Sequence, residues 1–122
     1  MINTIFAILL LLQVKHLIID WIWQPAYEHQ NKGIYGHWGG IRHALKHALG
    51  TAQCFIWFVP ISSISLIFVI DFCVHYHIDW AKVNLSSTFN TKDPQFWWLT
   101  GIDQFLHQIT YIGLIWMCLS LI

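Results

Sequence analysis

Four pairs of side chains that can bind metal ions recur along the chain, and the two members of each pair are four residues apart. The pairs are His16 and Asp20, His43 and His47, His75 and Asp79, and Asp103 and His107. Residues at this spacing lie on one face of an α-helix, so each pair can hold an ion from a single rigid element. The spacing therefore predicts a metal site built by several helices.

Three of the four pairs lie inside long apolar stretches, where ionisable side chains are costly and usually functional. The 122 residues are 57% hydrophobic and 10% charged, a composition typical of a membrane protein. Basic and acidic residues number six each, so the chain has no charge bias toward polyanions. We therefore do not expect nucleic acid as a partner.

The apolar stretches predict four membrane-spanning helices, because about 20 helical residues cross a hydrocarbon core roughly 30 Å thick. They are expected near residues 2–24, 41–59, 61–80 and 96–122. Pro25 ends the first helix, Pro60 makes a tight turn before the third, and Pro94 can begin the fourth. The expected fold is a single-domain, all-α transmembrane four-helix bundle that runs up-down-up-down.

Two longer connections, at residues 25–40 and 81–95, are polar enough to lie outside the hydrocarbon core. Within them we expect Glu28 to be a solvated loop charge and Asp93 to cap the last helix. In this topology all four pairs fall in the same half of the bundle, whereas the opposite halves of the helices are largely apolar. This one-sided polarity favours a pocket over a conduit through the bundle.

The basic residues all fall at the same end as the pairs. They are Lys15, Lys32, Arg42, Lys46, Lys82 and Lys92. By the positive-inside rule this end faces the cytoplasm, and both termini lie outside.

Eight candidate ligands are too many for one tetrahedral ion, and they suit two divalent metal ions. The three cysteines stand singly, so thiolate ligation has no support, and a histidine-rich set favours zinc, with iron or manganese as alternatives. Residues expected to hydrogen-bond to the ligands are Gln24, Asp71, Lys82 and Gln104. Arg42 and Lys46 are candidates for binding an anionic lipid head group, although they could also simply set the topology.

Three further histidines are off the pattern, namely His29, His37 and His77. His77 could replace His75 as a ligand, but the four-residue spacing from His75 to Asp79 matches the other helices. We therefore prefer His75.

The motifs occur in a fixed order: His16-x3-Asp20-x3-Gln24 with Asn31-Lys32-Gly33, then His43-x3-His47, His75-x3-Asp79-x2-Lys82 and Asp103-Gln104-x2-His107. In this order they resemble a small bacterial and phage family of integral membrane proteins, catalogued as domain of unknown function 3307. The resemblance covers nearly the whole chain. It implies a bacterial inner-membrane protein and supports the same site residues, but it names no reaction.

Several functions suit a two-metal site near a membrane surface. The first is a metal-dependent hydrolase that acts on a lipid or another amphiphilic substrate. Alternatives are a di-iron oxidoreductase acting on lipid, transport of metal ions or protons, and a non-catalytic membrane regulator in which metals only join the helices. A four-span bundle is small for alternating-access transport unless it forms a homo-oligomer, which is therefore a further possibility.

Overall fold

The computed structural model describes residues 1–122, which form helices and no strands, and this confirms the all-α fold class. The helices are α1 (Ile2–His16), a π-helical continuation η1 (Leu17–Ile22), α2 (Ala26–Asn31), α3 (Trp38–Phe55), α4 (Ile61–Leu85) and α5 (Pro94–Met117). The largest differences from the expected bounds are at two helix ends. α4 continues to Leu85, beyond the expected end at residue 80, and α5 stops at Met117, before the expected end at residue 122. The short helix α2 was not predicted.

Prolines fix the starts of three helices. Pro25 and Pro60 are extended residues immediately before α2 and α4, and Pro94 is the first residue of α5. Proline suits these places because the first helical N–H groups have no partner within the helix. Asp93 occupies the cap position of α5, but its carboxylate accepts a hydrogen bond from the Asn90 amide at 2.8 Å and none from the helix.

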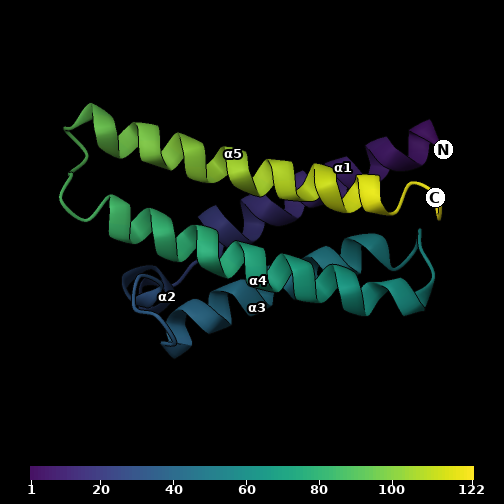
Figure 1. Ribbon diagram of the computed structural model, residues 1–122, viewed down its shortest axis with the longest axis horizontal. Helices are drawn as coiled ribbons and strands as arrows, with labels where there is room; N and C mark the ends of the chain where they lie inside the picture. Colours follow the sequence, from purple (N-terminus) through teal and green to yellow (C-terminus); the bar gives the residue numbers. More distant parts are fainter.

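The four long helices lie side by side and alternate in direction (Figure 1). Both termini and the turn between α3 and α4 lie at one end, whereas α2 and the connection between α4 and α5 lie at the other. α3 packs most extensively on α4, while α1 contacts both α3 and α5, and α4 contacts α5. The helices therefore enclose one interior.

This interior is divided along its length into an apolar half and a polar half. The apolar half, toward the termini, contains Ile8, Leu12, Phe55, Ile67 and Leu114, all buried in one cluster. The buried residues of the other half are mainly histidines, carboxylates and lysines. The predicted one-sided polarity is therefore present in the packed structure.

Two helices are long and apolar enough to cross a membrane, namely the continuous α1–η1 segment Ile2–Ile22 and α4. α3 and α5, with 18 and 24 residues, are long enough but not apolar enough, whereas the sequence predicted four spans. Charged and imidazole side chains in α3, such as Arg42 and His47, and the polar residues of α5, such as Asp103 and His107, lower the hydropathy of these helices. The residues that form the polar interior thus lower the mean hydropathy of α3 and α5, on which the recognition of a membrane span depends.

The connection at residues 25–40 folds back against the bundle. α2 packs on α3, where a Cβ atom on Gly40 would approach the Lys32 backbone to 3.2 Å. The expectation of a solvated Glu28 is wrong, because its side chain is 1% exposed. Its carboxylate accepts from Arg42 at 2.8 Å and lies 2.7 Å from the Lys46 ammonium. Burial would raise the pKa of Glu28, but hydrogen bonds from these two cations hold that pKa below its ordinary value.

Candidate metal centre

The predicted ligands converge in the polar half of the bundle. Seven of the eight are buried, and Asp20 is partly buried, so the cluster is largely shielded from solvent. His16 and Asp20 come from α1 and η1, while the other three pairs come from α3, α4 and α5. Side chains from α3, α4, α5 and the continuous α1–η1 segment therefore meet at one depth of the bundle.

Two groups of these side chains could each hold a metal ion. The first group is Asp20, His43, His47 and His75, and the second is His75, Asp79 and His107. Within each group the potential ligand atoms all lie within 4.8 Å of one another. Because His75 belongs to both groups, the two groups form one continuous centre.

Several donor atoms have the separations expected of ligands that share an ion. Asp20 Oδ1 lies 3.1 Å from His43 Nε2 and 3.7 Å from His47 Nε2. Asp79 Oδ2 lies 3.6 Å from His75 Nε2. Ligand atoms about 2.0–2.1 Å from a tetrahedral ion are about 3.3–3.4 Å apart. An ion could therefore be accommodated with small side-chain adjustments.

Asp79 connects the two groups. Its Oδ2 atom lies 3.2 Å from His43 Nε2, and its Oδ1 atom lies 3.2 Å from His107 Nε2. A carboxylate with its two oxygens directed at different imidazoles can bridge two ions.

His75 is the buried side chain with the least complete hydrogen bonding. Its ring is stacked between those of His47 and His107, with centroid distances of 3.7 and 4.1 Å. Neither nitrogen of His75 has a hydrogen-bond partner, and His47 Nε2 also lacks one. Buried polar atoms in folded proteins nearly always have a partner, so these nitrogens need an explanation. Ligation of a metal ion would satisfy His47 Nε2 and one nitrogen of His75.

His16 and Asp103 lie at the edge of the cluster, outside both groups. Both nitrogens of His16 are in hydrogen-bonding contact, with the Tyr111 hydroxyl at 3.0 Å and with Gln104 Oε1 at 2.9 Å. Asp103 Oδ1 lies 3.5 Å from His107 Nε2 and has no hydrogen-bond partner. Asp103 can therefore join an ion held by His107 more readily than His16 can.

Two of the four predicted supporting residues contact the ligands. Gln24 donates to Asp20 Oδ1 at 3.2 Å, and Gln104 donates to Asp20 Oδ2 at 3.3 Å. Asp71 instead accepts from the Thr51 hydroxyl at 2.8 Å. The Lys82 ammonium lies 5.1 Å from the centre of the Phe96 ring, outside hydrogen-bonding contact with any ligand.

The two residues predicted to bind a head group, Arg42 and Lys46, both contact the buried Glu28. The same carboxylate lies 3.3 Å from His43 Nδ1. Glu28 therefore links these cations to a candidate ligand, a contact that the sequence did not predict.

Two buried lysines were also missed as parts of the cluster. Lys32 Nζ donates to Asp79 at 3.2 Å, and Lys15 Nζ lies 3.4 Å from His47 Nδ1. Burial would lower the pKa of Lys32, but the carboxylates of Asp79 and Asp20 raise that pKa above its ordinary value. Lys15 precedes His16 in an otherwise apolar helix, and this position could have indicated a lysine that faces the interior.

α4 contributes His75 to the cluster and directs His77 away from it. His77 is exposed, with Nε2 3.1 Å from the Tyr35 hydroxyl and Nδ1 2.6 Å from the Cys73 carbonyl oxygen. Of the other unpaired histidines, His29 contacts Gln24 and His37 accepts from the Gly39 amide at the start of α3.

A polar cleft of about 430 Å³ connects the cluster with the surface. Asp20 and Asp103 form its inner wall, and its charged side chains include Lys32 and Lys82. Water and a polar ligand could therefore reach the edge of the centre from the α2 end of the bundle.

The family model described as "Protein of unknown function (DUF3307)" matches residues 6–121, nearly the whole chain, which confirms the resemblance indicated by the spaced motifs. No curated protein and no solved structure matches the chain.

Proposed function

Because the chain belongs to this family of proteins of unknown function, its activity has to be inferred from its own residues, and we propose a membrane metalloprotein that binds two divalent ions. The main support is His75, which is buried between two other imidazoles with both ring nitrogens unpartnered. We further propose that the centre hydrolyses a membrane-associated substrate.

The outer surface supports an integral membrane location with four spans. Large apolar side chains such as Phe6, Leu66 and Phe105 are more than half exposed on α1, α4 and α5. The α3 surface adds Leu49, also more than half exposed. Soluble monomers rarely expose such extensive apolar surface, whereas lipid tails cover it readily. We place the protein in the inner membrane of a bacterium.

The donor set supports zinc as the resident metal, with iron or manganese as alternatives. In this proposal Asp20, His43 and His47 hold one ion, His107 and Asp79 hold the other, and His75 is available to either. Imidazoles and carboxylates without thiolates suit all three metals.

The polar cleft supports hydrolysis, because it offers water a path to the centre. Two bound ions would lower the pKa of a water molecule and polarise the scissile group. In an ester hydrolysis the water oxygen bonds to the carbonyl carbon or the phosphorus, the ester bond breaks, and the leaving oxygen takes up a proton. The Lys32 ammonium, at the cleft and 3.2 Å from Asp79, is placed to stabilise negative charge that develops there.

The apolar half of the interior argues against transport through the bundle. Ile8, Leu12, Phe55 and Ile67 are fully buried between the cluster and the end that bears the termini. An ion moving through this half would find no polar ligand, so the centre is open on one side only.

The metal content of protein purified without added metal tests the proposal. We expect about two zinc ions per chain in the wild type. His75→Ala should lower the occupancy of both sites, because His75 belongs to both ligand groups, whereas His107→Ala should lower chiefly one. His77→Ala is the matched control, since His77 lies two residues away and faces outward, and it should retain both ions.

Hydrolysis is tested with lipid vesicles made from bacterial lipid extract. Zinc-loaded wild type and His77→Ala should release a water-soluble head group or a fatty acid, and His75→Ala should not. A wild type without bound metal, or equal metal content in His75→Ala and His77→Ala, would reject the metal centre. Two iron ions with a visible absorption band would favour the oxidoreductase over the hydrolase.

A further inference from the structure

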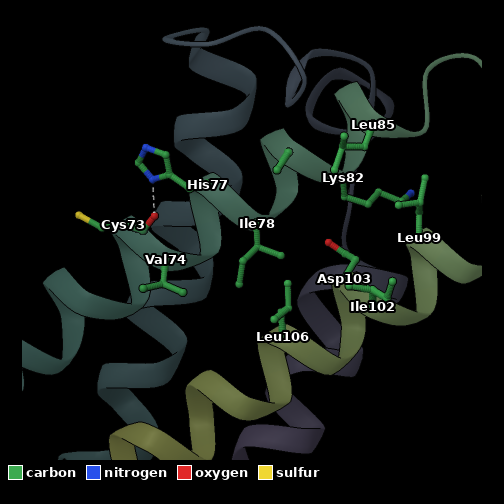
Figure 2. A pocket seen from close by; sticks show the side chains of 11 residues that line it. Cys73, Val74, His77, Ile78, Lys82, Leu85, Leu99, Ile102, Asp103 and Leu106 are labelled. Atoms are coloured by element: carbon green, nitrogen blue, oxygen red, sulfur yellow. Dashed lines mark hydrogen bonds between the residues drawn. The ribbon is translucent and has the colours of Figure 1, made fainter.

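An apolar groove of about 530 Å³ runs along the outside of the bundle between α4 and α5. Figure 2 shows Ile78 of α4 facing Leu106 of α5 across this groove, with Val74 at one end and Leu85 at the other. The groove lies beside the polar half of the interior. On a membrane protein such a surface hollow is open to lipid chains.

The groove is continuous with the polar cleft. Lys82 and Asp103 line both cavities. In Figure 2 the Lys82 side chain extends from α4 toward Leu99 of α5, and the Asp103 carboxylate is directed toward the interior. Because Asp103 Oδ1 lies 3.5 Å from His107 Nε2, the path from the apolar groove ends at the edge of the candidate metal centre.

Lys82 provides a free positive charge where the two cavities meet. It forms no ion pair, unlike Arg42 and Lys46, which are both engaged by Glu28. A groove that is apolar along its length and cationic at one end matches an amphiphile with an anionic head group.

The charge of the proposed centre also calls for an anion. Three carboxylates, those of Asp20, Asp79 and Asp103, and the ammonium of Lys32 leave two negative charges when the imidazoles are neutral. Two divalent ions would exceed these by two positive charges. A hydroxide and an anionic head group in the cleft would balance that excess.

We propose that the substrate is a membrane lipid with a phosphate head group of net negative charge, which places its acyl chain in the α4–α5 groove and its phosphate at Lys82. This inference rests on the proposed function and adds its substrate class. A third cavity, of about 420 Å³ between α1 and α3, shares no residue with the polar cleft and therefore serves as an internal comparison.

Photolabelling in vesicles tests the inference. The probes are phosphatidic acid and phosphatidylcholine, each with a diazirine on its acyl chain, and the labelled residues are mapped by mass spectrometry. We expect phosphatidic acid to label groove residues of α4 and α5, such as Val74, Ile78 and Leu106, in preference to the α1–α3 cavity. Lys82→Gln should lower this labelling about fivefold, whereas Lys92→Gln, an exposed lysine outside both cavities, should not.

Filling the groove provides an independent test. Leu106→Trp, at a position already 41% exposed, and Ala81→Trp should each displace the probe from the groove. Val69→Trp, on the exposed face of α4 outside the groove, is the matched control and should leave labelling unchanged. Each variant is first checked for an unaltered thermal unfolding midpoint. The test can be carried out with either groove variant if the other does not fold.

Four outcomes would overturn the inference: labelling spread evenly over the outward faces of all helices, labelling insensitive to both tryptophans, equal groove labelling by the two lipids, or cross-links to a second copy through the groove. The metal content of the wild type, measured beside its labelling, separates this inference from the proposed function. Selective groove labelling in a wild type that lacks metal would support the lipid site while the metal centre fails. Normal metal content without selective labelling would reject the lipid site alone.

Discussion

The Tyr111 hydroxyl forms hydrogen bonds with Lys15 and His16 at the inner edge of the histidine cluster. It accepts a hydrogen bond from Lys15 at 2.8 Å and can donate its own proton to His16 Nδ1, 3.0 Å away. His16 Nε2 is then the protonated nitrogen, which donates to Gln104 Oε1 at 2.9 Å, and Gln104 in turn donates to Asp20. The chain of bonds runs in one direction and assigns His16 to orienting the centre.

Tyr111→Phe should break this chain without changing the packing volume. Lys15 and His16 Nδ1 would lose a partner inside the bundle, so we expect the free energy of unfolding to fall by about 1–3 kcal/mol. The measurement is denaturant unfolding in detergent. Tyr35→Phe is the matched control, because Tyr35 is 63% exposed, and it should change stability by less than about 0.5 kcal/mol. A loss of less than about 0.5 kcal/mol in Tyr111→Phe would show that the buried hydroxyl does not stabilise the fold.

At the scale of the elements, the π-helical segment η1 adjusts the register of the first helix. The Trp23 amide bonds to the Ile18 carbonyl, five residues back, at 2.7 Å. A π-helical turn holds more residues than an α-helical turn and therefore rotates the side chains that follow. In this segment Asp20 lies 3.1 Å from His43 of α3. A prediction based on a period of 3.6 residues could not include this turn.

Much of the candidate site was predictable because helical spacing places residues on faces. The four-residue spacing brought the paired residues to one interior and distinguished His75 from His77. Prolines gave the starts of α4 and α5 for a local reason, the unpaired N–H groups of a first helical turn. Glu28, Lys15 and Lys32 were not predicted as buried members, because their partners lie on other elements and no local pattern encodes those contacts.

The docking of α2 on α3 should depend on pH through Glu28. The folded pKa of this carboxyl is lowered, so its ion pairs stabilise the protein above the unfolded pKa of about 4.3 and are lost as pH falls through the lower folded value. Glu28→Gln should therefore lower stability at pH 7, by about 1–3 kcal/mol, and flatten the loss of stability below about pH 4.5.

Unfolding midpoints between pH 3 and pH 7 measure this effect. Asp93→Asn is the control, because Asp93 belongs to the exposed end of the bundle and bonds only to the nearby Asn90 amide. An unchanged pH profile in Glu28→Gln would mean that the buried ion pairs do not stabilise the docked helix.

At the scale of the whole molecule, the bundle is apolar outside, polar inside at one end and apolar inside at the other. The structure also changes the basis of the proposed orientation. Lys15, Lys32, Arg42 and Lys46 all bind partners within the protein, which leaves Lys82 and Lys92 as the free cations at the site end. The positive-inside argument therefore depends on fewer charges than the sequence suggested.

Topology labelling distinguishes four spans from two. If all four long helices cross the membrane, Asn31 and Asn90 lie on the same side, because α3 and α4 together return the chain to it. If only Ile2–Ile22 and α4 cross, Asn31 and Asn90 lie on opposite sides. We expect Asn31→Cys and Asn90→Cys to be protected from an impermeant maleimide in intact cells and to react after lysis. Ser120→Cys, near the C-terminus, should react from outside.

The wild type measures the background reaction, since Cys54 and Cys118 are buried and Cys73 is exposed on α4, where lipid would cover it in the proposed location. Reaction of Asn31→Cys and Asn90→Cys only from outside would reverse the orientation but keep the four spans and the centre. Opposite accessibility of Asn31→Cys and Asn90→Cys would remove α3 from the membrane, and equal accessibility of Asn90→Cys and Ser120→Cys would remove α5. In either case His43, His47 and His107 could not all share one depth with Asp79 in a lipid-embedded bundle, and the centre would have to assemble at the membrane surface.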